Sequence, residues 1–375
     1  MWKIPFYDIS YGDEEIDAVT NVIKSGWLTM GEITEQFETR LKDFLGCKFA
    51  YAVSNGTAAL HLANSALGIG HNDEIICPSL TFVAGPNTIM ATSGKPVFAD
   101  IESLQNFCIS PEDIEKKISK RTKAIQVMHY AGFPCNMEAI SAIAKKNKLY
   151  VIEDSAHAIG SEFQGKKCGT IGDIGCFSFF SNKNLSMGEG GLVVTNNQIL
   201  ADKIKLMRSH GMTTLTLQRA KGHAFSYDVV SHGFNYRIDE MRCALGLVQF
   251  KKLIDNNIKR KELVGHYLKK LSSIDYIDIP FKNNDSKANH HIFPVLLDQR
   301  INRLKFMSFL KSKQIQTSIH YQPAHLFSYY QKEIEYNSLP VTEEVGKREV
   351  TLPLYPTMTF DDIDYIVRIM KQYTN

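Results

Sequence analysis

The chain has 375 residues, of which 44% are hydrophobic, and its 43 basic and 40 acidic residues give a net charge of +3. A chain of this length can bury a large core, and it is expected to divide into a larger and a smaller domain. The balanced charge has no basic stripe, which argues against nucleic acid as a partner. No apolar run approaches the roughly 18 residues of a membrane span, and the start lacks the apolar core of a signal peptide. We therefore expect a cytoplasmic protein that makes no membrane contact.

The seven cysteines are odd in number and form no Cys-x-x-Cys pair. In a cytoplasmic chain of this size such cysteines are expected to be reduced thiols. Their spacing predicts no metal site.

Short apolar runs alternate with amphipathic stretches through the first two thirds of the chain. Two helices come first, over 14–24 and from Ile33 to Phe44, each stopped by a glycine. Strand–helix alternation then predicts an α/β fold, with a mostly parallel central sheet flanked by helices. The predicted strands are 49–53, 73–77, 96–100, 123–128, 149–153, 175–179 and 191–195; the helices between them are 57–67, 81–93, 110–119, 136–147 and 197–208.

The pattern changes near residue 240, where a long helix is predicted from Ile238 to Leu271, followed later by a strand at 291–297. We expect a large domain over 1–240. Residues 241–375 should supply a bridging helix and a small C-terminal α+β domain.

A phosphate-loop pattern, GxxxxGK, occurs at 160–167. Lys167 stands where a P-loop needs Ser or Thr, and a loop follows where a P-loop needs a helix. We interpret the segment as a surface hairpin. The first strand is also not followed by the GxGxxG of a dinucleotide site.

Three other segments carry residues suited to chemistry. After the strand ending at Val53, Gly56 permits a tight turn and Thr57 opens an Ala-rich helix, whose N-terminus can bind an anion. Taken alone, this first pattern is more often an ordinary helix N-cap.

The second segment follows an apolar strand with Glu153, Asp154 and His157. Ligands of α/β sheets bind at this end of the strands, and a carboxylate leaving a buried strand needs a cation or a protonated nitrogen. The alternative is a capping Asp and a surface His. In the third segment, an aromatic-rich strand runs into Lys183 and a glycine-rich turn at 188–191. Burial there would lower the lysine pKa and suit Schiff-base chemistry, although an exposed loop lysine would give the same pattern.

Together the three segments match the needs of pyridoxal 5′-phosphate (PLP). The helix N-terminus would hold its phosphate, the acid would keep its pyridine nitrogen protonated, and the lysine 29 residues later would bind its aldehyde.

On these motifs the chain resembles the DegT/StrS-type family of sugar aminotransferases, PLP enzymes of fold-type I. The resemblance spans essentially the whole length. It is carried by residues 3–6, 25–31, 55–57, 78–84, 153–158, Lys183 with 188–191, 233–237, 320–325 and 352–356.

The resemblance implies that Lys183 binds the cofactor covalently and later moves the proton, while Asp154 pairs with the pyridine nitrogen. It places His157 near the cofactor's 3′-oxygen and Phe82 on its ring face. Asn235 would reach the cofactor of a neighbouring subunit, which implies a homodimer with shared active sites. The alternatives are that Asn235 is an ordinary polar residue of a loop and that Phe82 is an ordinary aromatic residue of the core. The residues implied to hold the phosphate are Gly56, Thr57 and Ser178.

Family members move an amino group from L-glutamate to a keto group of a nucleotide-linked 6-deoxyhexose, in the synthesis of lipopolysaccharide, glycan or antibiotic sugars. Lys183 sets this chain apart from a dehydrating branch that has histidine there. The stretch 218–228 resembles perosamine-synthetase-like members, which favours 4-keto substrates. His320, Tyr321 and His325 are expected to contact the sugar or nucleotide.

Two alternatives remain: an aminotransferase of a cyclitol or other carbocyclic ketone, and a PLP-binding regulator without turnover. The nucleotide, the sugar, and C3 against C4 amination are not determined by the sequence, nor is any assembly beyond a dimer.

Overall fold

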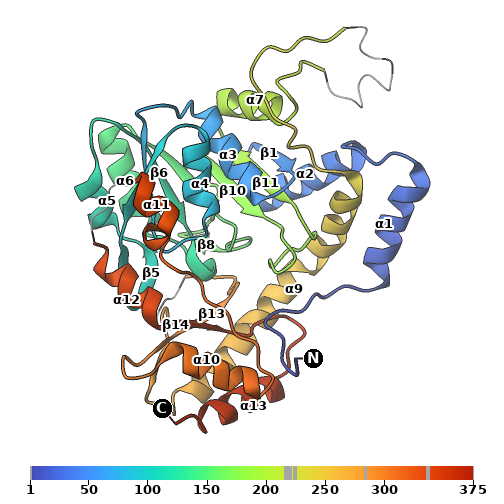
Figure 1. The fold of residues 1–375 in the computed structure, drawn as a ribbon. Coiled ribbons are helices and arrows are strands. Elements are labelled where there is room, and N and C mark those ends of the chain that lie inside the picture. Colours follow the sequence, from blue (N-terminus) through green and yellow to red (C-terminus); the bar gives the residue numbers. More distant parts are fainter. Residues whose placement is uncertain are drawn as a thin grey trace.

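The computed structural model describes residues 2–214, 222, 226–282, 284, 286–334 and 338–374. Its centre is a seven-stranded sheet with the order β1-β11-β10-β7-β6-β2-β3 (Figure 1). The strands are β1 (Phe49–Val53), β2 (Glu74–Pro78), β3 (Lys95–Ala99), β6 (Thr122–Met128), β7 (Tyr150–Asp154), β10 (Ile174–Ser178) and β11 (Gly191–Thr195).

Neighbouring strands from β10 to β3 are parallel, and β11 alone runs antiparallel to both of its neighbours within this sheet. The mostly parallel α/β sheet predicted from the sequence is thereby confirmed. Each of the seven strands predicted for this sheet has bounds within one residue of an observed strand, because buried strands leave nearly continuous apolar runs.

Helices cover both faces of the sheet. Along the strands, alternate side chains enter different cores, so Ile75 packs with α3, α4 and α7 whereas Ile76 packs with α5 and α6. A third core joins α2 and α9 to the β1, β10 and β11 end of the sheet. The helices are α1 (Asp13–Ser25), α2 (Glu32–Leu45), α3 (Gly56–Ala66), α4 (Ala84–Ala91), α5 (Pro111–Lys117), α6 (Met137–Asn147) and α7 (Gln198–Met207).

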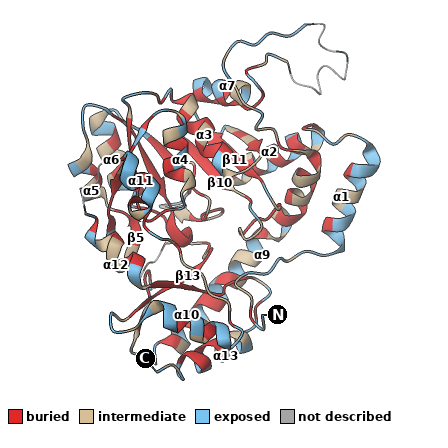
Figure 2. Cartoon of the chain, in the orientation of Figure 1, coloured by how far each residue is buried: buried red, intermediate tan, exposed pale blue. Residues whose placement is uncertain are grey.

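The 32-residue helix α9 (Glu240–Leu271) runs from the large sheet to a smaller layer near both termini (Figure 1). That layer is a three-stranded sheet of order β12-β13-β14 with its own apolar core, seen as buried strands and helix faces in Figure 2. Its elements and those beside it are β12 (Ile277–Asp278), β13 (Phe293–Leu297), α10 (Arg303–Ser312), η2 (Ala324–Leu326), α11 (Ser328–Glu333), α12 (Pro340–Arg348), β14 (Glu349–Leu352) and α13 (Phe360–Met370).

The segment with the phosphate-loop pattern forms the antiparallel hairpin of β8 (Glu162–Phe163) and β9 (Lys166–Lys167), as expected. A second hairpin, β4 (Ile101–Ser103) with β5 (Asn106–Ile109), and the short helix η1 (Tyr130–Gly132) were not predicted.

All seven cysteines are free and buried. Across the described ranges, no helix is long and apolar enough to cross a membrane. The same ranges contain no cluster of three or more His, Cys, Asp or Glu side chains suited to a metal ion.

Candidate active site

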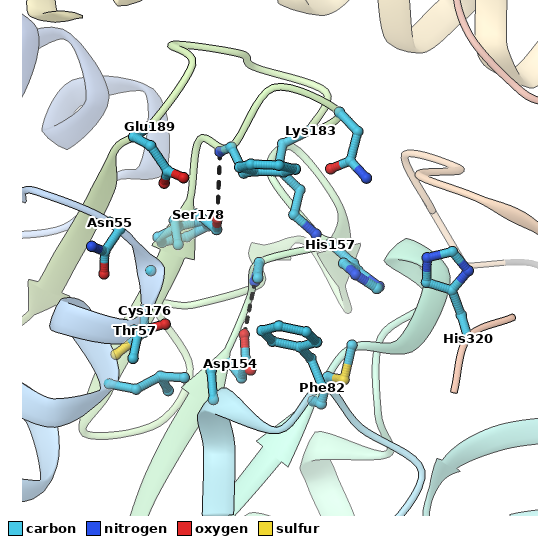
Figure 3. Close-up of a pocket in the computed structure, with 18 of the residues that line it drawn as sticks. Asn55, Thr57, Phe82, Asp154, His157, Cys176, Ser178, Lys183, Glu189 and His320 are labelled. Carbon is cyan, nitrogen blue, oxygen red and sulfur yellow. Dashed lines mark hydrogen bonds between the residues drawn. The ribbon is translucent and has the colours of Figure 1, made fainter. Parts of the chain in front are cut away.

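A cavity of about 410 Å³ opens at the carboxyl ends of β7 and β10, where ligands of α/β sheets bind (Figure 3). Segments far apart in the chain meet there: the start of α3, the turn before α4, the loops after β7 and β10, and residues 320–321 of the small layer. The predicted residues that line it are Gly56, Thr57, Phe82, Asp154, His157, Ser178, Lys183, His320 and Tyr321.

Asp154 is the last residue of β7 and is 5% exposed. Its carboxylate accepts a hydrogen bond of 3.1 Å from the backbone N–H of Ala156, drawn dashed in Figure 3. Burial raises its pKa above the ordinary value, and the nearby Lys183 opposes that rise. A cationic or N–H group entering the cavity would complete its hydrogen bonding.

Lys183 follows β10, the strand that pairs directly with β7. Burial lowers the pKa of its amine to about 8, against the opposing effect of Asp154. About a tenth of the amine is therefore neutral at pH 7, far more than for a lysine with an ordinary pKa, as a nucleophile or base requires. The lysine is not the exposed loop residue of the alternative interpretation.

The start of α3 combines a helix cap with an open N-terminus. The Asn55 side chain accepts from the N–H of Ala58 at 2.8 Å, so the ordinary cap is present. The first hydrogen bond within the helix is donated by Ala59 N to Asn55 O, so the amides of Gly56 and Thr57 have no acceptor in the helix, and both residues line the cavity. A Cβ on Gly56 would lie 2.8 Å from that of Ser178, so only glycine lets this turn approach β10 so closely.

Three buried histidines surround the lysine. Burial lowers the pKa of His157 and His291 well below the ordinary value, and that of His320 to about 3. His157 Nε2 lies 2.9 Å from the Tyr321 hydroxyl, and His157 Nδ1 has no hydrogen-bond partner among the described residues. These neutral rings can exchange hydrogen bonds with a ligand without adding positive charge beside Lys183.

The cavity fits PLP on observations of its own. It offers an amine for an aldehyde, a buried carboxylate for a pyridine nitrogen, and a helix N-terminus for a phosphate. The Phe82 ring is 55% exposed beside the cavity and is free to stack on a flat ring. The unsatisfied His157 Nδ1 is a hydrogen-bonding position for a ring substituent.

Two predicted residues lie elsewhere. His325 is fully buried, with Nδ1 at 2.6 Å from the Ser79 hydroxyl and Nε2 at 3.4 Å from Glu343, and it is not among the residues that line the cavity. Asn235 is an exposed residue whose backbone bridges to Ser209, and it too is absent from the residues that line the cavity. Of the stretch 218–228, residues 218–221 and 223–225 lie outside the described residues.

Other contributors were not found from the sequence. Phe180, Asn182 and Glu189 line the cavity, and His291 Nε2 lies 3.3 Å from Lys183 Nζ. His291 lies two residues before β13 and 108 residues beyond Lys183, and no local spacing connects the two. The sequence pointed to His291 only as a polar residue at the start of a predicted apolar strand.

A family model described as the DegT/DnrJ/EryC1/StrS aminotransferase family matches residues 10–371. The GDP-perosamine synthase of Vibrio cholerae is 35% identical over 376 residues, which cover 99% of each chain. Among solved structures, the Helicobacter pylori aminotransferase PseC, involved in the biosynthesis of pseudoaminic acid, has a TM-score of 0.92 at 31% identity, covering 98% of each chain. The PLP-form of the putative sugar aminotransferase Spr1654 from Streptococcus pneumoniae has a TM-score of 0.91 at 25% identity, covering 98% of this chain and 97% of that one.

Proposed function

Because the chain belongs to the DegT/DnrJ/EryC1/StrS aminotransferase family, and is thus a PLP-dependent aminotransferase, we propose that it moves an amino group from L-glutamate to a nucleotide-linked 4-keto-6-deoxyhexose. The observation that carries the proposal is the convergence of Lys183, Asp154 and the α3 N-terminus on one cavity. The resemblance to the Vibrio cholerae GDP-perosamine synthase supports the 4-keto position and a role in polysaccharide or lipopolysaccharide synthesis.

Bound PLP supplies an aldehyde that carries the amino group between donor and acceptor and a ring that takes up electrons. Each residue of the cavity then has a defined task. Asp154 would keep a proton on the pyridine nitrogen, the amides of Gly56 and Thr57 with the Ser178 hydroxyl would bind the phosphate, and Phe82 would pack against the ring.

Lys183 would hold the cofactor, and its amine is suited to act as the base. Its neutral amine accepts a proton at Nζ from the substrate carbon and delivers it again, which a lysine with an unshifted pKa would do poorly at neutral pH. His157 donates or accepts at the cofactor's 3′-oxygen. His320 and Tyr321 lie at the cavity wall contributed by the small layer, where they would contact the sugar.

We propose further that the active protein is a cytoplasmic homodimer with shared active sites. Asn235 is exposed and does not line its own cavity, which suits a residue that acts on a neighbouring subunit. Seven free thiols suit a reducing compartment.

The first test is borohydride reduction of the PLP-incubated protein followed by peptide mapping with mass spectrometry. We expect the pyridoxyl adduct on the peptide that carries Lys183, and none in Lys183→Ala, which should fold normally and lose turnover. An adduct on another lysine, or transamination by Lys183→Ala, would contradict the assignment.

The substrate is tested separately by coupled assay of 2-oxoglutarate formed from L-glutamate. The acceptors are nucleotide-linked 4-keto- and 3-keto-6-deoxyhexoses and an inosose, offered in parallel. Preference for the 4-keto sugar supports the proposal, whereas preference for the inosose would favour the carbocyclic alternative.

A further inference from the structure

A chain of hydrogen bonds leads from the Lys183 amine into the protein interior. Lys183 Nζ lies 3.3 Å from His291 Nε2, and His291 Nδ1 lies 3.0 Å from Asn184 Oδ1. The Asn184 amide nitrogen donates in turn to the backbone carbonyl of Asn289 at 3.0 Å and to Asn257 Oδ1 at 2.8 Å. Asn184 and Lys183 are consecutive, so the chain closes on the lysine's own loop.

The direction of every bond in this chain is fixed by chemistry. A backbone carbonyl can only accept, so the Asn184 amide nitrogen faces Asn289 and its oxygen faces His291. That oxygen also only accepts, so His291 Nδ1 carries the ring hydrogen. His291 is neutral because burial and the nearby Lys183 lower its pKa well below the ordinary value. Its Nε2 therefore presents a lone pair to Lys183.

We infer that His291 is a positioning residue for Lys183, accepting one N–H of the amine and fixing Nζ where the lysine moves its proton. The inference rests on the proposed function of Lys183 as the base. When the lysine carries the proton, its ammonium donates a charge-assisted and hence stronger bond to the same lone pair. His291 thus orients the neutral base and stabilises its protonated form.

The imidazole is held firmly enough for this task. The ring packs on that of His157 at a centroid distance of 4.3 Å, and the backbone N–H of His291 donates to Ala131 O at 2.9 Å. Arg260, itself buried, donates to the His291 carbonyl at 3.1 Å. A preorganised partner spares the lysine the entropy of finding its geometry in each turnover.

Two substitutions of His291 distinguish a role in positioning Lys183 from a role in packing alone. His291→Gln keeps an acceptor at the place of Nε2, facing Lys183, and loses the donor to Asn184. His291→Asn keeps a donor at the place of Nδ1 and loses the bond to Lys183. His290→Gln is the matched control, because the neighbouring His290 packs edge-on against Phe133, outside the cavity lining.

The first readout uses the full chain freed of cofactor, with Lys183 titrated by trace acetylation across pH and quantified by peptide mapping. We expect a midpoint near pH 8 for the wild type, His291→Gln and His290→Gln. In His291→Asn the midpoint should fall by about one pH unit or more, because the protonated amine loses a charge-assisted bond. Equal midpoints in the Gln and Asn variants would overturn the inference.

The second readout is the single-turnover reaction of the holoenzyme with L-glutamate. We expect His291→Asn to slow about 10- to 100-fold with unchanged glutamate affinity, and His291→Gln to recover most of that loss. Equal losses in both variants, or full activity in His291→Asn, would contradict positioning. A wild-type chain without Lys183-dependent turnover would instead refute the proposed function, and the acetylation midpoints would still decide whether His291 binds the lysine.

Discussion

Glu153 and Asp154 are consecutive carboxylates of β7 that face opposite sides of the sheet. Glu153 accepts from His129 Nε2 at 2.9 Å and from the backbone N–H of Gly169 at 2.7 Å, with two more amides at residues 171 and 172. Asp154 faces the cavity, where its one bond to Ala156 N leaves lone pairs for a ligand. Strand alternation thus separates a carboxylate that fixes the 169–172 loop from one that serves the site.

This separation predicts different defects for two isosteric substitutions. Asp154→Asn removes the charge that would hold a proton on the cofactor ring, and we expect transamination to fall about 10²- to 10³-fold with little change in thermal midpoint. In Glu153→Gln an amide NH2 group replaces one carboxylate oxygen, so the three backbone N–H donors around it have one acceptor fewer. The free energy of unfolding should therefore drop by about 2 kcal/mol or more. Turnover assays and thermal denaturation of both variants test this, and a reversed pattern would show that the roles are exchanged.

The close approach of α3 to β10 gives a second prediction. Gly56→Ala places a Cβ 2.8 Å from Ser178 Cβ, so the turn must move away from the strand. Overpacking of this kind costs about 1–3 kcal/mol, and we expect the dissociation constant for PLP to rise about tenfold or more. Gly70→Ala is the control, because a Cβ there meets no atom within 4 Å. Unchanged PLP affinity in Gly56→Ala, measured by fluorescence titration, would place the phosphate elsewhere.

A third prediction concerns the pH dependence of stability. Glu349 is fully buried beneath His320, accepting its backbone N–H at 2.8 Å and the Thr351 hydroxyl. Burial raises its pKa from 4.5 to about 8, against the effect of these hydrogen bonds. Between these two values the folded state binds more protons than the unfolded state, so this group's contribution to stability is lost as pH rises.

Glu349→Gln resembles the protonated acid and should remove that loss. We expect the thermal midpoint of the variant, relative to wild type, to be higher at pH 8.5 than at pH 5.5. Parallel pH curves for the two proteins would show that Glu349 is already ionised at the lower pH.

The sequence predicted the sheet and the parts of the site that are encoded locally. Asp154 ends β7 and Lys183 lies in the loop just after β10, and because these neighbouring strands are parallel, their carboxyl ends bring the two residues to the same edge of the sheet. The β4–β5 hairpin was missed because its strands have only three and four residues, too few for a periodic pattern.

Residues supplied by the small layer were harder to place. His291 reaches Lys183 because the segment before β13 docks against the loop that follows β10, a contact that no spacing in the sequence reports. His320 and His325 belong to one motif in the sequence, yet the former lines the cavity and the latter bonds to Ser79 behind it. The backbone conformation between the two histidines places them in different surroundings. That conformation depends on tertiary contacts, which the sequence motif does not report. The division of the chain near residue 240 remains a prediction.

The last prediction tests shared active sites by mixing two defective proteins. Asn235→Ala leaves each subunit's own Lys183 intact but would impair the cofactor site of its partner, whereas Lys183→Ala disables its own site. In a heterodimer of the two, the site with an intact lysine borrows an intact Asn235 from the Lys183→Ala subunit. The opposite site carries both defects.

If the two variants associate at random, about half of the dimers are heterodimers, and each heterodimer has one intact site. The unfractionated mixture should therefore have about a quarter of the wild-type activity. The mixture is prepared by co-expression with two affinity tags, and the heterodimer is isolated before assay, when about half of the wild-type activity is expected. Lys183→Ala paired with wild type is the control for subunit exchange. If the isolated heterodimer is no more active than Asn235→Ala alone, Asn235 acts within its own subunit, and the exposed position of this residue must serve another purpose.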